Sequence, residues 1–344
     1  MVIIGVDAHK YTHTVVAVDA QGRQLAVKTI GTTTADHLGL LAWAHGHDDE
    51  LLWAVEDCRQ LSRRLERDLL AAGQRIVRVP PKLMTNMRDA ARSFGKSDPI
   101  DALAVARAAL REPDLPVARL DGPERDVRLL VDHREDLVAE RTRILSRLRW
   151  HIHELDPSWQ PSARGLDRPR AVNETAARLD RQSGVVARLA RDLVERLRIL
   201  NAQINALADE ITALVEKLAP SLVAICGCGP LTAAKILGET AGVTRFRSND
   251  AYARHNGTAP LPVWSSNRSR HRLSRRGNRQ LNAALHRIAL TQAHYHPGAR
   301  ALIARRRANG DGGLEALRVL KRRLSDVVYH ALLTDAHGLA TASS

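Results

Sequence analysis

The sequence predicts an α/β domain at the N-terminus followed by a longer, all-α remainder. Two observations support this division. Short apolar runs alternate with amphipathic segments over the first hundred residues, which is typical of a chain that alternates between strands and helices. From about residue 115 onward, apolar residues recur at spacings of three and four, which is the period of an amphipathic helix. On this pattern the 344 residues divide into three predicted domains, 1–114, 115–219 and 220–335.

The first three strands are expected at residues 2–6, 14–18 and 24–30. The first is a short apolar run and the second is rich in β-branched residues, both of which favour strands. A turn at residues 21–23 leads directly from the second strand into the third. The opening segment is therefore predicted to form an antiparallel meander.

Two further strands are each preceded by a helix. Thr34 is a candidate cap for a helix over residues 35–45, which leads to a fourth strand at 51–55. An amphipathic helix over 59–72 then leads to a fifth strand at 75–79. Three antiparallel strands followed by helix, strand, helix and strand form the order of the ribonuclease H-like fold.

Two long helices are expected in the second segment, separated by a break rich in proline and glycine at residues 156–169. The first helix carries a short apolar stripe around Leu137 and Leu148. The second carries a stripe of about 30 residues, from Leu189 to Leu214, with charged residues between its members. This stripe fits periods of about 3.5 and 3.6 residues equally well. A coiled coil or long helical hairpin and an ordinary bundle within one subunit therefore both remain open.

The third segment, after Pro220, is expected to be a compact helical module. Residues 225–233 form a glycine-containing hairpin between two predicted helices and resemble the helix-hairpin-helix of many DNA-binding proteins. Gly227 and Gly229 allow a tight turn, and the N–H groups at the start of the next helix, near Thr232, can bind a phosphate. An ordinary corner between two helices is the alternative.

Positive charge is concentrated toward the C-terminus. The chain has a formal net charge of +14, and residues 261–330 contain 15 Lys or Arg against 3 Asp or Glu. Residues 1–110 are nearly neutral, with 14 basic and 13 acidic side chains. This asymmetry favours a nucleic acid bound through the C-terminal part, although a basic surface that only improves solubility is the alternative.

Neither membrane insertion nor secretion is expected. Arg or Asp interrupts every apolar stretch before it reaches the roughly 18 residues of a membrane helix. The first seven residues lack the basic region and cleavage site of a signal peptide. Cys58, Cys226 and Cys228 cannot form a disulfide framework and have no partners at zinc-finger spacing. We therefore expect a cytoplasmic protein with no membrane partner.

Four carboxylates occupy positions that favour catalysis. Asp7 directly follows the first strand and Glu56 the fourth, and parallel neighbouring strands would bring both to one edge of the sheet. Asp98 and Asp101 open a helix, where a separation of three residues puts both on one face. Asp98 before Pro99 could instead act as a helix N-cap, and Asp101 could complete that cap.

A cluster of carboxylates is unfavourable without a cation. At ~4 Å and an effective dielectric constant of ~20, each pair of like charges costs on the order of 4 kcal/mol. A divalent cation between the carboxylates removes this repulsion, and oxygen ligands select Mg²⁺ or Mn²⁺. Such a site activates a nucleophile and stabilises the leaving oxygen in phosphodiester chemistry.

A second candidate site lies in the basic C-terminal segment. Prolines and glycine predict an exposed loop that contains Ser265 and Ser266. A loop serine is usually inert, but here arginines that can hold phosphate surround it. No His–Asp pair at triad spacing lies nearby, so activation by the metal site is the simpler hypothesis. The candidate nucleic-acid contacts are Gly227, Gly229, Thr232, Arg268, Arg272, Arg275, Arg276, Asn278 and Arg279.

Together these motifs resemble the bridge-RNA-guided DEDD transposases of one insertion-sequence family, which are related to the Piv-type DNA invertases. The resemblance runs nearly end to end. Its motifs are GVDAHK at 5–10, VED at 55–57, KSDPIDA at 96–102, ICGCGPLTA at 225–233, NGTAP at 256–260, the serine pair, and LSRRGN at 273–278. It implies a RuvC-like N-terminal domain, a helical coiled-coil connector and a C-terminal transposase domain.

The resemblance also implies chemistry. It matches Asp7, Glu56, Asp98 and Asp101 to a set of Mg²⁺ ligands that catalyses DNA strand cleavage and exchange. It matches Ser266 to a nucleophile that forms a covalent phosphoserine intermediate with DNA.

The family usually has glycine after this serine, where this chain has Asn267, so Ser265 is the alternative nucleophile. The partners implied are donor DNA, target DNA, a non-coding guide RNA and further copies of the chain in a dimer or tetramer. The implied location is the bacterial cytoplasm, at the nucleoid when active. A metal-dependent junction or structure-specific nuclease that uses water is the alternative function, and a nucleic-acid-binding scaffold without activity is a third.

Overall fold

The computed structural model describes residues 1–56, 61–81, 83–84, 97–112, 114–115, 117–118, 122–159, 161, 166, 168–265, 268–272 and 277–342. The chain forms two compact units. The sheet unit comprises Met1–Asp121 and Gly242–Gly277, and the helical unit comprises Gly122–Ala241 and Asn278–Ser344. These units divide the chain at points that differ from the three predicted domains, because residues 242–277 group with the N-terminal sheet.

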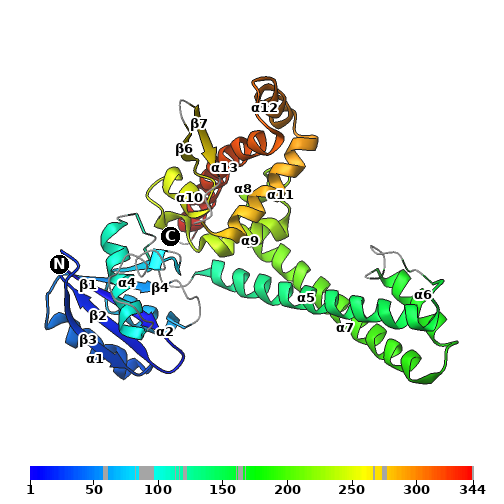
Figure 1. The fold of residues 1–344 in the computed structure, drawn as a ribbon, viewed down its shortest axis with the longest axis horizontal. Coiled ribbons are helices and arrows are strands. Elements are labelled where there is room, and N and C mark those ends of the chain that lie inside the picture. Colours follow the sequence, from blue (N-terminus) through cyan, green and yellow to red (C-terminus); the bar gives the residue numbers. More distant parts are fainter. Residues whose placement is uncertain are drawn as a thin grey trace. The chain divides into compact units, whose positions relative to one another are not determined.

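The sheet unit is built on five strands, shown in blue and cyan in Figure 1. They are β1 (Val2–Ala8), β2 (His13–Val18), β3 (Gln24–Ile30), β4 (Leu51–Glu56) and β5 (Ile76–Val79), in the order β3-β2-β1-β4-β5. β1, β2 and β3 pair antiparallel, whereas β4 is parallel to both β1 and β5. The predicted antiparallel meander and the parallel pairing of the first and fourth strands are confirmed, which gives a ribonuclease H-like sheet.

Helices cover both faces of this sheet. α1 (Thr34–His45) and α2 (Arg63–Ala71) pack on one face around Trp53, while α4 (Asp98–Arg111) packs on the other. β1 and β2 are buried along their whole length, which explains why most of their residues are apolar. The cap of α1 is Thr33, one residue before the predicted Thr34, because its hydroxyl accepts a hydrogen bond from the backbone N–H of the third helical residue.

Residues 242–277 add a short helix and a strand pair to the sheet unit. They form a 3₁₀ turn, η1 (Val243–Arg245), then α10 (Asn249–His255) and the antiparallel strands β6 (Leu261–Ser265) and β7 (Arg268–Arg272). The sequence predicts an exposed loop in a helical domain here. This prediction is wrong for Ser265, which is the last residue of β6 and pairs with Arg268 of β7. Prolines argued against a strand, but a strand at an edge tolerates them.

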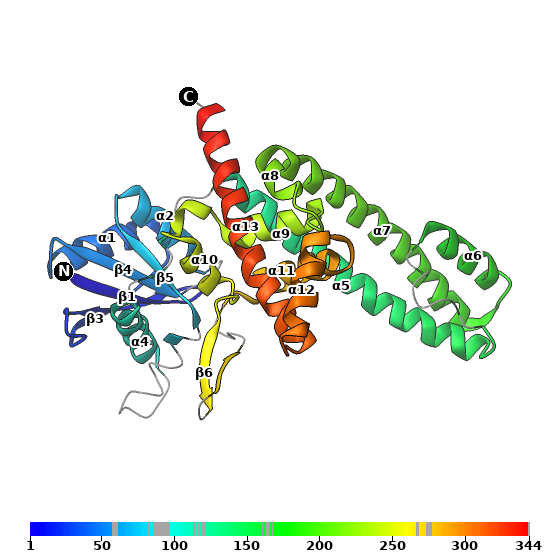
Figure 2. The same ribbon diagram turned by 90° about the horizontal axis from the view of Figure 1, so that it is seen from above.

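The helical unit contains the two long helices that the sequence predicts. α5 (Pro123–Leu155) and α7 (Gly184–Leu218) lie side by side in both views, with α6 (Pro169–Leu179) against them (Figures 1 and 2). Their shared core contains Leu148 of α5 and Leu197 of α7. The apolar stripe of α7 thus packs within its own chain in a helical hairpin. A coiled coil between chains stays a prediction.

The remaining helices complete the helical unit. They are α8 (Pro220–Val223), α9 (Pro230–Thr240), α11 (Arg279–Tyr295), α12 (Pro297–Ala308) and α13 (Gly313–Ala342). Gly227 has a φ of +84°, and a Cβ there would lie 2.9 Å from Cβ of Thr291, so only glycine fits. The helix before this turn has four residues, so a helix-hairpin-helix is not confirmed. None of the described helices combines the length and the apolarity needed to cross a membrane.

Candidate metal centre

The strand register brings two of the predicted acids to one edge of the sheet. Val6 of β1 pairs with Val55 of the parallel strand β4, and Asp7 and Glu56 are the residues that follow them. Asp7 is buried, with 5% of its surface exposed. Its burial follows from its place inside the central strand of the sheet, where both neighbouring strands continue alongside.

Helix α4 carries the other two acids to the same strand. A Cβ at Gly5 would lie 2.2 Å from the carbonyl oxygen of Ala102, so glycine at this position allows α4 to lie directly on β1. The N-cap position of α4 is Ser97, and Asp98 is the first helical residue. The alternative role of Asp98 as an N-cap is therefore wrong. Asp101, one turn further on, is buried.

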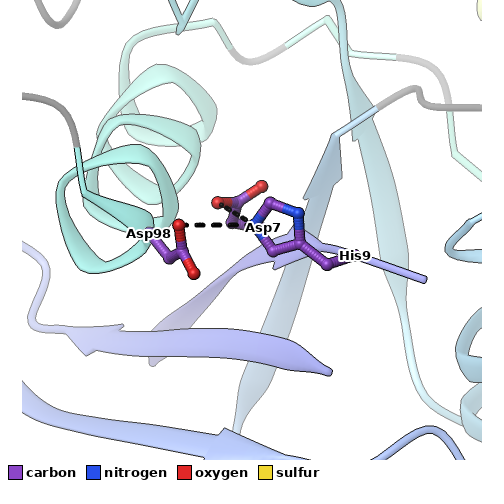
Figure 3. Close-up of side chains that lie close together, drawn as sticks. All are labelled: Asp7, His9 and Asp98. Carbon is purple, nitrogen blue, oxygen red and sulfur yellow. Dashed lines mark hydrogen bonds and ion pairs between the residues drawn. The ribbon is translucent and has the colours of Figure 1, made fainter. Parts of the chain in front are cut away.

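His9 completes a cluster that the sequence analysis did not identify (Figure 3). Its Nε2 lies 3.1 Å from Oδ2 of Asp7 and 3.5 Å from Oδ1 of Asp98. One ligand atom from each of these three residues lies within 4.8 Å of the other two. The available signal was position: His9 follows Asp7 by two residues, the spacing that puts two side chains of an extended segment on the same face.

The electrostatics of the cluster favour a bound cation. Burial raises the pKa of Asp7, and the nearby carboxylates of Asp101 and Asp98 raise it further, while His9 acts in the opposite direction. An ionised Asp7 has therefore lost much of its hydration and has carboxylates for neighbours. A divalent cation supplies the charge that such a site lacks, so the residues present fit a metal such as Mg²⁺ or Mn²⁺. Glu56 and Asp101 lie outside the three-residue ligand cluster.

The basic segment is described in part. Ser266, Arg275 and Arg276 lie outside the described residues. Ser265 is the last residue of β6, and its backbone pairs with Arg268 at the start of β7. The strand β7 also contains Arg272 at its end.

The other candidate nucleic-acid contacts have local roles. Asn278 is the N-cap of α11, where its Oδ1 accepts hydrogen bonds from two backbone N–H groups, and its Nδ2 donates to Oε2 of Glu239 at 2.7 Å. Arg279 is exposed in the first turn of the same helix. Gly229 is the N-cap of α9, and the backbone N–H of Thr232 bonds to its carbonyl oxygen.

Two arginines attach α10 to the chain that follows α4. The carboxylate of Asp114 lies 2.6 Å from a guanidinium nitrogen of Arg247 and 2.6 Å from one of Arg254. Both ion pairs lie within the sheet unit. They join the segment that carries β6 and β7 to the segment that follows the helix of Asp98 and Asp101.

Comparison with known proteins identifies relatives at both ends of the chain. A DEDD transposase family of IS110 type matches residues 4–157, and the IS116/IS110/IS902 transposase family matches residues 219–304. A 44.8 kDa protein of insertion element IS116 from Streptomyces clavuligerus is 28% identical over 96% of this chain and 94% of its own. A 42 kDa protein of insertion element IS900 from Mycobacterium paratuberculosis is 27% identical over 96% of this chain and 95% of its own.

Among solved structures, Thermus thermophilus RuvC is similar to part of the chain. Its complex with a Holliday junction is 18% identical, covers 33% of this chain and 95% of RuvC, and has a TM-score of 0.27.

Proposed function

We propose that this chain is a transposase of the IS110/IS116 type, an enzyme of DNA cleavage and recombination, and that it cleaves and rejoins DNA at a divalent-metal centre; the two transposase families that match residues 4–157 and 219–304 support this. The ligands in this proposal are Asp7, Glu56, Asp98 and Asp101, and the structure adds His9 as a residue that positions two of them. The observation that carries the proposal is the cluster of Asp7, His9 and Asp98, whose ligand atoms lie within 4.8 Å of one another.

Asp7, Asp98 and His9 have distinct tasks in this proposal. Asp7 is held rigidly by the central strand, so it would fix the position of the cation. Asp98 has 55% of its side chain exposed and would face the incoming phosphodiester. When bound, Mg²⁺ or Mn²⁺ would stabilise negative charge on the scissile phosphate. His9 would orient Asp7 and Asp98, since its Nε2 lies between their carboxylates.

Ser266 is the proposed nucleophile. Its oxygen would replace one deoxyribose oxygen on the phosphorus, and the serine proton would leave with the released hydroxyl. The number of phosphoester bonds is then unchanged, so the strand can be rejoined by the reverse reaction. Two observations support this assignment: residues 242–277 form one unit with residues 1–121, and Asp114 ties α10 to that unit.

The proposal extends to the partners that the sequence resemblance implies. These are a non-coding guide RNA and a dimer or tetramer that holds two DNA duplexes together. The support for a nucleic-acid partner is the excess of basic residues in 261–330, with Arg275 and Arg276 among them. RNA that copurifies with the chain and is protected from nuclease would support the guide, and light scattering would give the oligomeric state.

The experiment that tests the metal centre is a plasmid recombination assay. Asp7→Asn and Glu56→Gln should each abolish recombination in Mg²⁺ or Mn²⁺, because each removes a charged ligand. Glu50→Gln is the matched control, since Glu50 is exposed immediately before β4, whereas Glu56 ends the same strand. Recombination by Asp7→Asn at the rate of the unmodified protein would refute the proposal.

A further inference from the structure

A second basic surface lies on helix α5, in the helical unit. Residues 141–153 of this helix, RTRILSRLRWHIH, contain four arginines, two histidines and one tryptophan, and no acidic residue. The metal centre, in the sheet unit, does not involve this stretch, and it precedes the basic C-terminal segment by more than a hundred residues. Its function is therefore a separate question.

The two faces of α5 differ in chemistry. The face with Ile144 and Leu148 is buried against α7. The side chains of Arg143, Arg147 and Trp150 are exposed instead. Their spacing of four and three residues puts these three side chains in one row along the helix. Over seven residues the row spans about 10 Å.

Trp150 is a large aromatic residue that is mostly exposed to solvent. It has 72% of its surface exposed, in a chain where Trp53 is completely buried. The ring of His153 lies nearly perpendicular to the indole, with 6.3 Å between ring centroids, and no ring of the described residues stacks parallel to Trp150. An exposed indole face is a surface on which a flat, polarisable ring can stack.

The two arginines of the row lack compensating charge. Glu140, the acid that precedes them, is bound to Arg196 of α7 at 2.7 Å. Arg147 has Arg143 four residues before it, so two like charges are neighbours on the helix surface. Within the part of the chain that the structure describes, neither Arg143 nor Arg147 has an ion-pair partner.

We propose that this row binds single-stranded DNA, with a base stacked on Trp150 and phosphates held by Arg143 and Arg147. Aromatic side chains beside a line of positive charge are the standard means of binding unpaired strands. A duplex does not fit as well, because its bases are already stacked on one another. At 3.4 Å per stacked nucleotide, the row accommodates about three nucleotides. The choice of DNA rests on the proposed function, since strand exchange exposes unpaired bases.

The test measures binding of a fluorescent single-stranded 20-mer to the full chain in the presence of a chelator, so the result does not depend on the metal centre. Trp150→Ala should weaken binding about tenfold, and Trp150→Phe should restore it to within about threefold. Arg143→Ala and Arg147→Ala should each lower the slope of log Kd against log salt by about 0.7. Arg170→Ala is the matched control, because Arg170 is exposed on α6 but already paired with Glu174.

A crosslink locates the contact. An oligonucleotide that carries 5-iododeoxyuridine should form an adduct on the peptide that contains Trp150. The inference would be overturned if Trp150→Ala bound the 20-mer as tightly as the unmodified protein does. It would also be overturned if the protein bound RNA more tightly than DNA of the same sequence. A third contradicting result is a Trp150→Ala variant whose oligomeric state changes while its DNA affinity does not. Loss of recombination in Asp7→Asn with unchanged binding would leave this inference intact.

Discussion

Replacing Asp7 with asparagine should make the metal-free protein more stable while it removes activity. The ligand atoms of Asp7 and Asp98 lie within 4.8 Å of each other. Two unit charges at this separation repel by about 3 kcal/mol at an effective dielectric constant of ~20. Solvent around the half-exposed Asp98 screens this repulsion, and His9 offsets part of it, which leaves a net gain of about 1 kcal/mol for Asp7→Asn.

The gain should depend on pH with a definite sign. The pKa of Asp7 is raised in the folded protein, chiefly by burial. The protonated carboxyl therefore contributes stability that is complete below the pKa of the unfolded chain, near 4, and is lost as pH rises through the raised pKa. Asparagine does not titrate. The stability difference between Asp7→Asn and the unmodified protein should thus be small at pH 3.5 and largest at neutral pH.

Urea unfolding with and without a divalent cation measures both effects. In chelator at pH 7, the Asp7→Asn variant should unfold at a higher urea concentration than the unmodified protein. With cation at a hundred times its Kd, the unmodified protein should gain about 2.7 kcal/mol and the variant far less. Equal stabilisation of both proteins by Mg²⁺ and by Mn²⁺ would refute the assignment of Asp7 as a ligand.

Three further predictions concern the sheet unit. Gly5→Ala should destabilise it by about 2 kcal/mol or more, seen as a lower thermal midpoint, because the added Cβ would lie 2.2 Å from the carbonyl oxygen of Ala102. His13 is buried and its pKa is lowered to about 4, so the free energy of unfolding should fall by about 3 kcal/mol as the pH falls from 6.5 to 4. Urea unfolding of His13→Gln should show a weaker pH dependence. The same pH dependence in the variant and in the unmodified protein would count against this role of His13. Asp114→Asn removes the charge that pairs with Arg247 and Arg254, so α10 should lose about 1 kcal/mol of local stability and its amide hydrogens should exchange faster. Asp114→Glu keeps the charge and should leave the exchange rate unchanged.

The sheet could be predicted from the sequence because its strands are unambiguous. The apolar and β-branched runs of β1 and β2 are buried along their whole length. An amphipathic helix would instead show polar residues every three or four positions, so these runs indicate strands. Once the first and fourth strands are parallel neighbours, Asp7 and Glu56 must meet at one edge. The predicted cap of α1, Thr34, is one residue away from the actual cap, Thr33, because adjacent threonines are equally good cap residues by sequence.

Three features depend on tertiary context. The strands β6 and β7 were not foreseen, because Pro262 disfavours a central strand and only an edge position accommodates it. An apolar stripe on α7 is buried equally well by a helix of the same chain or of another, so its period does not reveal the partner. His9 lies one residue beyond the end of β1, and only the packing of α4 on the sheet brings its Nε2 close to both Asp7 and Asp98.

The measurement that tests the central claim most directly is a denaturing gel of end-labelled substrate DNA incubated with the protein and a divalent cation. We expect a covalent protein–DNA adduct with the unmodified chain and with Ser265→Ala. With Ser266→Ala we expect no adduct and no cleavage, although that variant should still bind DNA, because only the chemical step is lost. Cleavage without an adduct in all three proteins would contradict the account and would indicate water as the nucleophile.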